Sequence, residues 1–236
     1  MYEDDDFEPP ESYTSISFKF KTIRIVDNVI TAFTNVLNTE VYIDEDADDV
    51  SINVALEKIH FWFDYIVSNG ILFNRDNEFA LSLMFDEHGL SKTANIPIVL
   101  PDEPSDDIIC AMLHSKLNAL GNNVMHFGNM NITSDTKENL VLTFIGMGEL
   151  MLPAMDEWIG ARAFHDKPWW SRNDGSTLDI IPLDDSDLSE PPDFGVDLTF
   201  IEDRFQKKTS NTSMVIRPEF KPQVINGGKT DDDPKN

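Results

Sequence analysis

The stretch that decides the fold is SDDIICAMLHSKLNALGNNVMHFGNMNI, residues 105–132. Apolar residues recur along its first half at the spacing of one helix face. Ser105 is a typical N-cap residue and Gly121 a typical residue just past a helix end, so we predict a helix over 105–120. The apolar residues of 124–132 then predict a strand. A helix followed directly by a strand indicates a domain that contains both.

The remaining patterns extend this reading to most of the chain. We expect further strands at residues 16–25, 40–44, 79–85, 96–101, 140–145, 177–182 and 196–202, helices at 28–38 and 54–66, and a short amphipathic stretch at 150–159. Pro97 favours an edge position for its strand, because proline cannot donate a hydrogen bond to a neighbour. The prediction is one α+β domain with a mixed or mainly antiparallel sheet and about three helices.

Domain boundaries follow from composition. Residues 1–12 are acidic and contain Pro9-Pro10, so they are expected to form a flexible arm. Residues 13–205 form the predicted domain. Residues 206–236 are polar and rich in turn-forming residues, and we expect a flexible tail there.

The net charge of −25 limits the classes of partner. Nucleic-acid phosphates and anionic membranes both require a basic footprint, so direct binding to either is not expected. A protein partner with a basic surface is more natural. The acidity belongs to residues 1–205, because 206–236 contain six lysines and arginines against four acids.

Compartment is predicted from the cysteine content and from hydropathy. Cys110 is the single cysteine, so neither an internal disulfide nor a cysteine-based zinc cluster can form. The N-terminus does not resemble a signal peptide, and no apolar run approaches the roughly 18 residues of a membrane span. We expect a cytoplasmic protein, in the host cytoplasm if the chain is viral.

Motifs that would name a reaction are not found. Asp44, Asp46 and Asp48 have the spacing of a calcium loop, but the loop lacks the required glycine and the final glutamate. The five histidines show no metal-ligand spacing. His165-Asp166 matches the His-Asp pair of metal phosphohydrolases, but a match of two residues is too short to indicate a metal site. We therefore expect neither a metal nor another cofactor, and no catalytic residue is assigned.

The stretch AFHDKPWWSRNDG, residues 163–175, is the strongest candidate for a contact surface. Exposed tryptophan beside arginine is typical of binding hot spots, and Asn173-Asp174-Gly175 indicates a turn. The alternative is that the tryptophans anchor this loop to the sheet; we expect one tryptophan of each kind, the exposed one beside Arg172. The predicted partner-binding residues are Trp169, Trp170, Arg172, Asp184, Asp185, Asp187, Leu188 and Phe194.

These observations favour a non-enzymatic acidic protein that binds a basic surface of another macromolecule. Such a chain is compatible with a phage-encoded or other accessory factor that modulates a host machine. One alternative is an assembly component whose tails become ordered on neighbouring subunits. Another is an enzyme whose site is assembled from residues distant in sequence.

Overall fold

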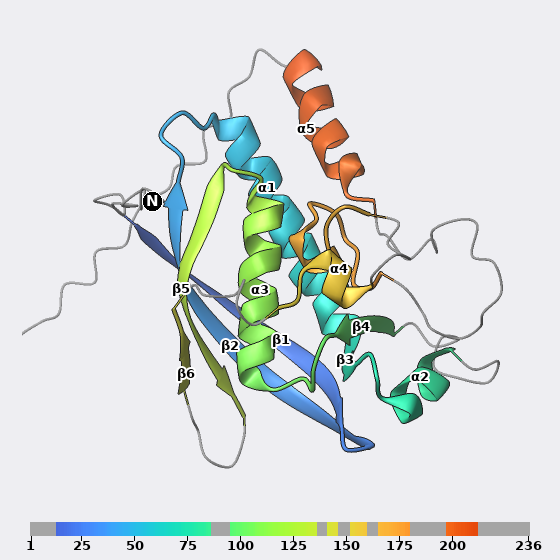
Figure 1. The fold of residues 1–236 in the computed structure, drawn as a ribbon. Coiled ribbons are helices and arrows are strands. Elements are labelled where there is room, and N and C mark those ends of the chain that lie inside the picture. The colour runs from blue at the N-terminus through green and yellow to red at the C-terminus, as the bar shows by residue number, and fades with distance from the viewer. Residues whose placement is uncertain are drawn as a thin grey trace, which may run out of the picture.

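The computed structural model describes residues 13–85, 95–135, 141–145, 152–159, 165–179 and 197–211. Its centre is a single six-stranded sheet in the order β4-β3-β1-β2-β5-β6 (Figure 1). The strands are β1 (Thr14–Val26), β2 (Val29–Ile43), β3 (Gly70–Asn74), β4 (Ile96–Leu100), β5 (Met125–Ser134) and β6 (Val141–Phe144). Strands β1, β3 and β4 are mutually parallel, whereas β2, β5 and β6 pair antiparallel. The sheet is mixed, and the predicted α+β class is confirmed.

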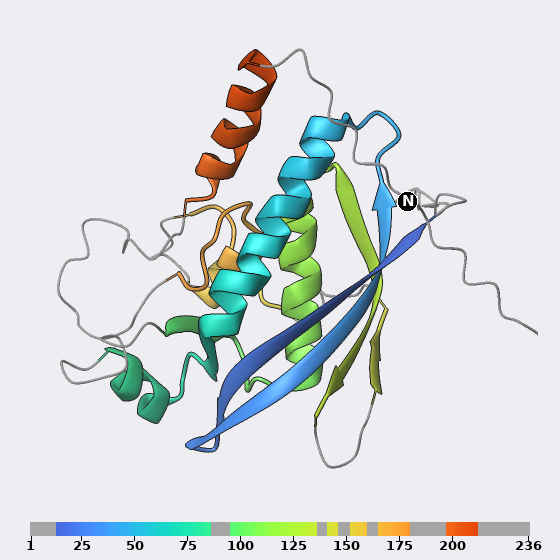
Figure 2. The same ribbon diagram turned by 180° about the vertical axis from the view of Figure 1, so that it is seen from behind.

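Two helices, α1 (Asp49–Phe61) and α3 (Asp106–Gly121), pack together and cover one face of the sheet (Figure 2). Helix α1 continues through a π-helical turn η1 (Trp62–Ile66) and a 3-10 turn η2 (Val67–Asn69) into β3. The other helices are α2 (Glu78–Phe85), α4 (Met155–Trp158) and α5 (Thr199–Asn211). The described residues thus contain five α-helices rather than about three. None of these helices combines the length and apolar character needed to cross a membrane.

The core lies between the helices and the inner face of the sheet. Leu37 and Val41 of β2 and Phe127 and Ile132 of β5 alternate with exposed or half-buried residues along their strands. From β1, Phe18 stacks on a ring of η1, with 4.4 Å between the two centroids. One face of the sheet is therefore apolar and covered, and the alternation follows the two-residue repeat of a strand.

The predicted helix at 28–38 is wrong, because these residues belong to β2. A tight turn at Asp27 and Asn28, both with positive φ of 48° and 64°, reverses the chain and pairs Val26 with Val29. This is the geometry of a type I′ hairpin turn, which favours asparagine and aspartate. The apolar residues of 29–37 happen to fit a helical spacing, but tertiary pairing with β1 decides the structure.

A buried polar cluster explains why the apolar pattern of β1 changes parity after Phe20. Thr22 and Arg24 lie buried on the inner face, where the Arg24 guanidinium donates to Asn35 Oδ1 at 2.7 Å and Ser134 Oγ at 3.0 Å. It also donates to Asp106 Oδ1 at 2.7 Å, at the start of α3. The register of β1 with β2 is continuous, so the change of parity involves no bulge in β1.

Two predicted strands are helices. Residues 79–85 form α2, which begins with the Asn77 side chain accepting the N–H of Ala80 at 2.9 Å. Residues 199–202 lie in α5, where Asp197 accepts the N–H of Thr199 at 2.8 Å. Both helices begin with an Asn or Asp cap, a signal that outweighs the apolar alternation.

The remaining predictions vary in accuracy. The strands at 96–101, 124–132 and 140–145 and the helix at 105–120 are confirmed, and β4 lies at a sheet edge as Pro97 favours. The residue that ends α3 in the left-handed conformation is Asn122, not Gly121. Residues 177–179 are irregular rather than a strand, and 180–182 lie outside the described residues. The predicted boundary at 205/206 falls inside α5.

Candidate functional site

Both tryptophans of the Trp169-Trp170 pair are buried, so the expectation that one of them is exposed beside Arg172 is wrong. Their exposed fractions are 0% and 2%. They form a 3-10 turn, η6 (Trp169–Ser171). The ring centroid of Trp170 lies 5.6 Å from that of Trp169 and 5.0 Å from that of Trp158 on α4. The pair therefore belongs to the core, which is the alternative that the sequence left open.

The segment 169–179 closes the outer edge of β4. The indole N–H of Trp169 donates to the carbonyl of Val99 at 2.9 Å, and the Val99 N–H donates to the carbonyl of Thr177 at 3.0 Å. The Thr177 hydroxyl donates to the carbonyl of Pro97 at 2.6 Å. Unpaired N–H and C=O groups of an edge strand can otherwise form hydrogen bonds with a strand of another chain. This segment satisfies them internally.

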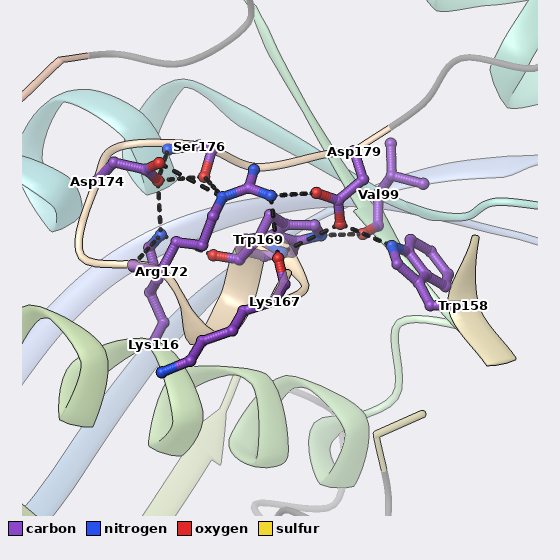
Figure 3. A network of polar contacts seen from close by, with 9 residues as sticks. All are labelled: Val99, Lys116, Trp158, Lys167, Trp169, Arg172, Asp174, Ser176 and Asp179. Carbon is purple, nitrogen blue, oxygen red and sulfur yellow. Dashed lines mark hydrogen bonds and ion pairs between the residues drawn. The ribbon is translucent and has the colours of Figure 1, made fainter. Parts of the chain in front are cut away.

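An ion pair between Arg172 and Asp179 holds the segment in place (Figure 3). Asp179 is only 6% exposed. Its Oδ1 pairs with the Arg172 guanidinium, while its Oδ2 accepts the indole N–H of Trp158 at 2.8 Å and the backbone N–H of Trp169 at 3.0 Å. One buried carboxylate thus satisfies three donors from two different elements.

Lys116 of α3 binds the same segment and is fully buried. Its Nζ donates to the carbonyls of Trp169 at 2.9 Å and Arg172 at 3.0 Å, and lies 3.5 Å from Asp174 Oδ1 (Figure 3). Burial lowers the pKa of Lys116 from 10.5 to about 7, although the Asp174 carboxylate opposes this shift. Lysines with such a pKa can serve as nucleophiles or bases. Here the amine is committed to two backbone carbonyls, which fits a support for the segment.

This buried lysine makes stability depend on pH. Between pH 7 and 8.5 the unfolded chain keeps the Lys116 proton that the folded chain releases, so raising the pH favours the folded state. We expect the free energy of unfolding to rise by about 1 kcal/mol per pH unit, measured by urea denaturation. The range stops below 9 because burial raises the pKa of Cys110 to about 12, which has the opposite effect on stability there.

Lys116→Met is the control for this pH dependence. The variant keeps the length of the side chain but has no titrating amine, so its stability should change much less over the same pH range. Equal slopes for the two proteins would show that another group causes the dependence.

The other five predicted partner-binding residues lie outside the described residues: Asp184, Asp185, Asp187, Leu188 and Phe194.

The calcium-like loop instead starts a helix. Asp48 Oδ1 accepts the N–H groups of Val50 and Ser51, and these hydrogen bonds hold the pKa of Asp48 below its usual value. Over the part of the chain that the structure describes, no three His, Cys, Asp or Glu side chains gather as possible metal ligands.

A surface aromatic cluster, which was not among the sequence predictions, lies along α1, η1 and α5. The Phe61 ring stacks on Tyr65 with centroids 4.8 Å apart, and Phe200 meets Phe61 edge-on at 5.3 Å. Tyr65 is 61% and Phe200 40% exposed. The spacing of Phe61 and Tyr65 was a usable signal, but Phe200 was assigned to a predicted strand.

Lys58 joins α1 to α5 and to the tryptophan segment. Its Nζ donates to Glu202 of α5 and to Asn173 Oδ1 at 3.3 Å, and its side chain is buried. A cavity of about 270 Å³ adjoins this contact, lined by Lys58, Glu202 and residues of α1 and the α3 C-terminus, including Val54, Leu120 and Asn122. A second cavity, of about 280 Å³, lies between α3, η6 and the residues just before α4. Neither cavity is lined by Lys116.

Charge is divided unequally between interior and surface. Three of the nine lysine and arginine side chains that the structure describes are buried, namely Arg24, Lys58 and Lys116. Among the described aspartates and glutamates, only Asp179 is buried. The three buried basic side chains therefore bond to groups inside the fold, whereas all described carboxylates except Asp179 are at least partly exposed.

Comparison with known proteins assigns no family. No family model matches the sequence, and no curated protein does. A similar solved structure is a catalytic-residue mutant of 6-pyruvoyltetrahydropterin synthase from Plasmodium vivax, at 9% identity and a TM-score of 0.31. The match covers 57% of this chain and 98% of that chain. A likeness at this level assigns no function to this chain.

Proposed function

We propose that this protein binds a basic surface of another macromolecule, most naturally a protein. The observation that carries the proposal is the division of charge: the most deeply buried bases, Arg24, Lys58 and Lys116, have internal polar partners, while nearly all described carboxylates remain at the surface. A surface of this kind attracts cationic partners and repels nucleic acid.

The end of the molecule at the start of α1 and along α5 is the best-suited region (Figure 1). The loop before α1 and its first turn expose Asp44, Glu45, Asp46, Asp48 and Asp49. The aromatic cluster of Phe61, Tyr65 and Phe200 lies farther along the same helix, where α1 continues into η1, and at the start of α5. Aromatic side chains supply much of the binding energy in protein interfaces. The proposed contact surface therefore consists of these exposed carboxylates and the aromatic cluster, and not of the buried Trp169-Trp170 pair.

Binding should depend on salt and on the position of the charge. The probe is a fluorescent peptide of nine residues that mixes lysine and arginine, with its affinity measured by anisotropy. We expect the affinity to fall roughly tenfold or more between 50 and 300 mM salt, because screening weakens attraction between exposed charges. The triple variant Glu45→Gln, Asp49→Asn, Asp203→Asn should lose several-fold more affinity at low salt than its control.

The matched control neutralises Asp27, Asp76 and Glu78, which are exposed in the β1–β2 turn and around the start of α2. These elements lie at the opposite end of the molecule (Figure 1). Both triple variants have the same net charge. If they weaken binding equally, the acidity acts only as overall charge, and the proposed surface is wrong.

A further inference from the structure

Five side chains form a continuous row on the surface between α1 and α5, which we call the α1–α5 ladder: Glu57, Phe61, Tyr65, Phe200 and Arg204. Phe61 lies between Tyr65 and Phe200, with its ring in contact with both. Arg204 lies over Phe200, with its guanidinium carbon 5.8 Å from the ring centroid, and its Nη1 is 4.0 Å from Glu57 Oε2. The ladder thus combines aromatic rings, a carboxylate and one arginine.

The arginine of the ladder is weakly held. The 5.8 Å separation is near the outer limit for a cation over a ring, and the 4.0 Å contact is at the limit for an ion pair. The side chains of Arg204 and Glu57 are about half exposed, so solvent screens their attraction. A better-placed guanidinium could displace Arg204 at little cost.

Buried contacts beneath the ladder hold the start of α5 against α1. Leu198 and Ile201, near the start of α5, are buried. Lys58 ties Glu202 to α1 from the interior, one residue from the ladder position Glu57. The rings of Phe61 and Phe200 are therefore held close to each other before any partner arrives, and a preorganised surface binds with a smaller entropic cost.

We propose that the α1–α5 ladder receives an arginine side chain of the partner and that Arg204 is an internal placeholder that this arginine displaces. This inference rests on the proposed function, since it specifies the chemistry of the same surface. A guanidinium stacks on aromatic rings and pairs with carboxylate in a planar geometry, which a lysine ammonium cannot reproduce. The incoming guanidinium would take the position of Arg204, over the Phe200 ring and beside Glu57, and Phe200 is 40% exposed.

The test uses the full chain and two peptides of nine residues and equal charge, one built on arginine and one on lysine. We expect the arginine peptide to bind several-fold more tightly at 50 mM salt. Phe200→Ala should remove most of this preference, and Tyr65→Ala, at the other end of the row of rings, should remove less of it; both variants should leave the melting temperature nearly unchanged. Arg204→Ala should tighten binding of the arginine peptide about threefold, because the internal competitor is gone.

The control for Arg204→Ala is Lys21→Ala, which removes one exposed positive charge from β1 and changes the net charge equally. If both variants tighten binding equally, or if the two peptides bind alike, the ladder is not an arginine receptor. In either case salt-sensitive binding would still support the proposed function. If neither peptide binds in a salt-sensitive manner, the proposed function fails as well.

Discussion

Replacing Trp169 by alanine lowers the free energy of unfolding by about 3–5 kcal/mol, the usual cost of truncating a buried aromatic side chain. The ring is fully buried, and its N–H satisfies the Val99 carbonyl at the β4 edge, so the variant leaves both a cavity and an unpaired acceptor. Trp170→Ala should lower the free energy of unfolding by a similar amount, because it also removes a buried ring. Urea denaturation monitored by far-UV circular dichroism measures the change.

The matched control is Tyr65→Ala, an aromatic truncation on the exposed ladder, which should change stability by no more than about 0.5 kcal/mol. In the folded fraction of Trp169→Ala, affinity for the arginine peptide should equal that of the unchanged protein. A variant that stays fully stable but loses binding would instead support the hot-spot role that the sequence suggested for this pair.

Replacing Asp179 by alanine is expected to cost about 3–5 kcal/mol, the range found when one member of a buried ion pair is removed. The Arg172 guanidinium would lose its buried carboxylate partner and keep the partly exposed Asp174, whose Oδ2 lies 3.4 Å from the Arg172 Nε. The indole N–H of Trp158 and the backbone N–H of Trp169 would lose their acceptor at the same time.

Asp166→Ala is the control, since Asp166 is an exposed acid three residues before that segment. It should leave stability almost unchanged. Asp179→Asn keeps an oxygen acceptor without the charge, so its effect should fall between the two. A stability loss for Asp179→Ala no larger than that for Asp166→Ala would mean that the buried network does not hold the segment.

Part of the candidate site could be read from the sequence and part could not. The sequence singled out 163–175 as a candidate contact surface, with anchoring of the tryptophans to the sheet as the alternative, but the expected exposed tryptophan is not found, because both are buried. Burial of the two tryptophans depends on contacts with Val99 and Asp179. Val99 is distant along the chain, and no sequence pattern marks Asp179 as a hydrogen-bond acceptor. The α1–α5 ladder was missed for the same reason: Phe61 and Phe200 meet only after folding.

By itself, the sequence determined the fold class, the helix at 105–120, the edge position of β4 and the excess of negative charge. These features arise from local periodicity, capping and composition, which neighbouring residues express without tertiary contacts. Tertiary structure alone decided that 29–38 belongs to a strand, that both tryptophans are buried and that three basic side chains lie inside. The physical reason is that burial and strand pairing depend on partners far away in the chain, whose contribution outweighs a residue's own preference for helix, strand or surface.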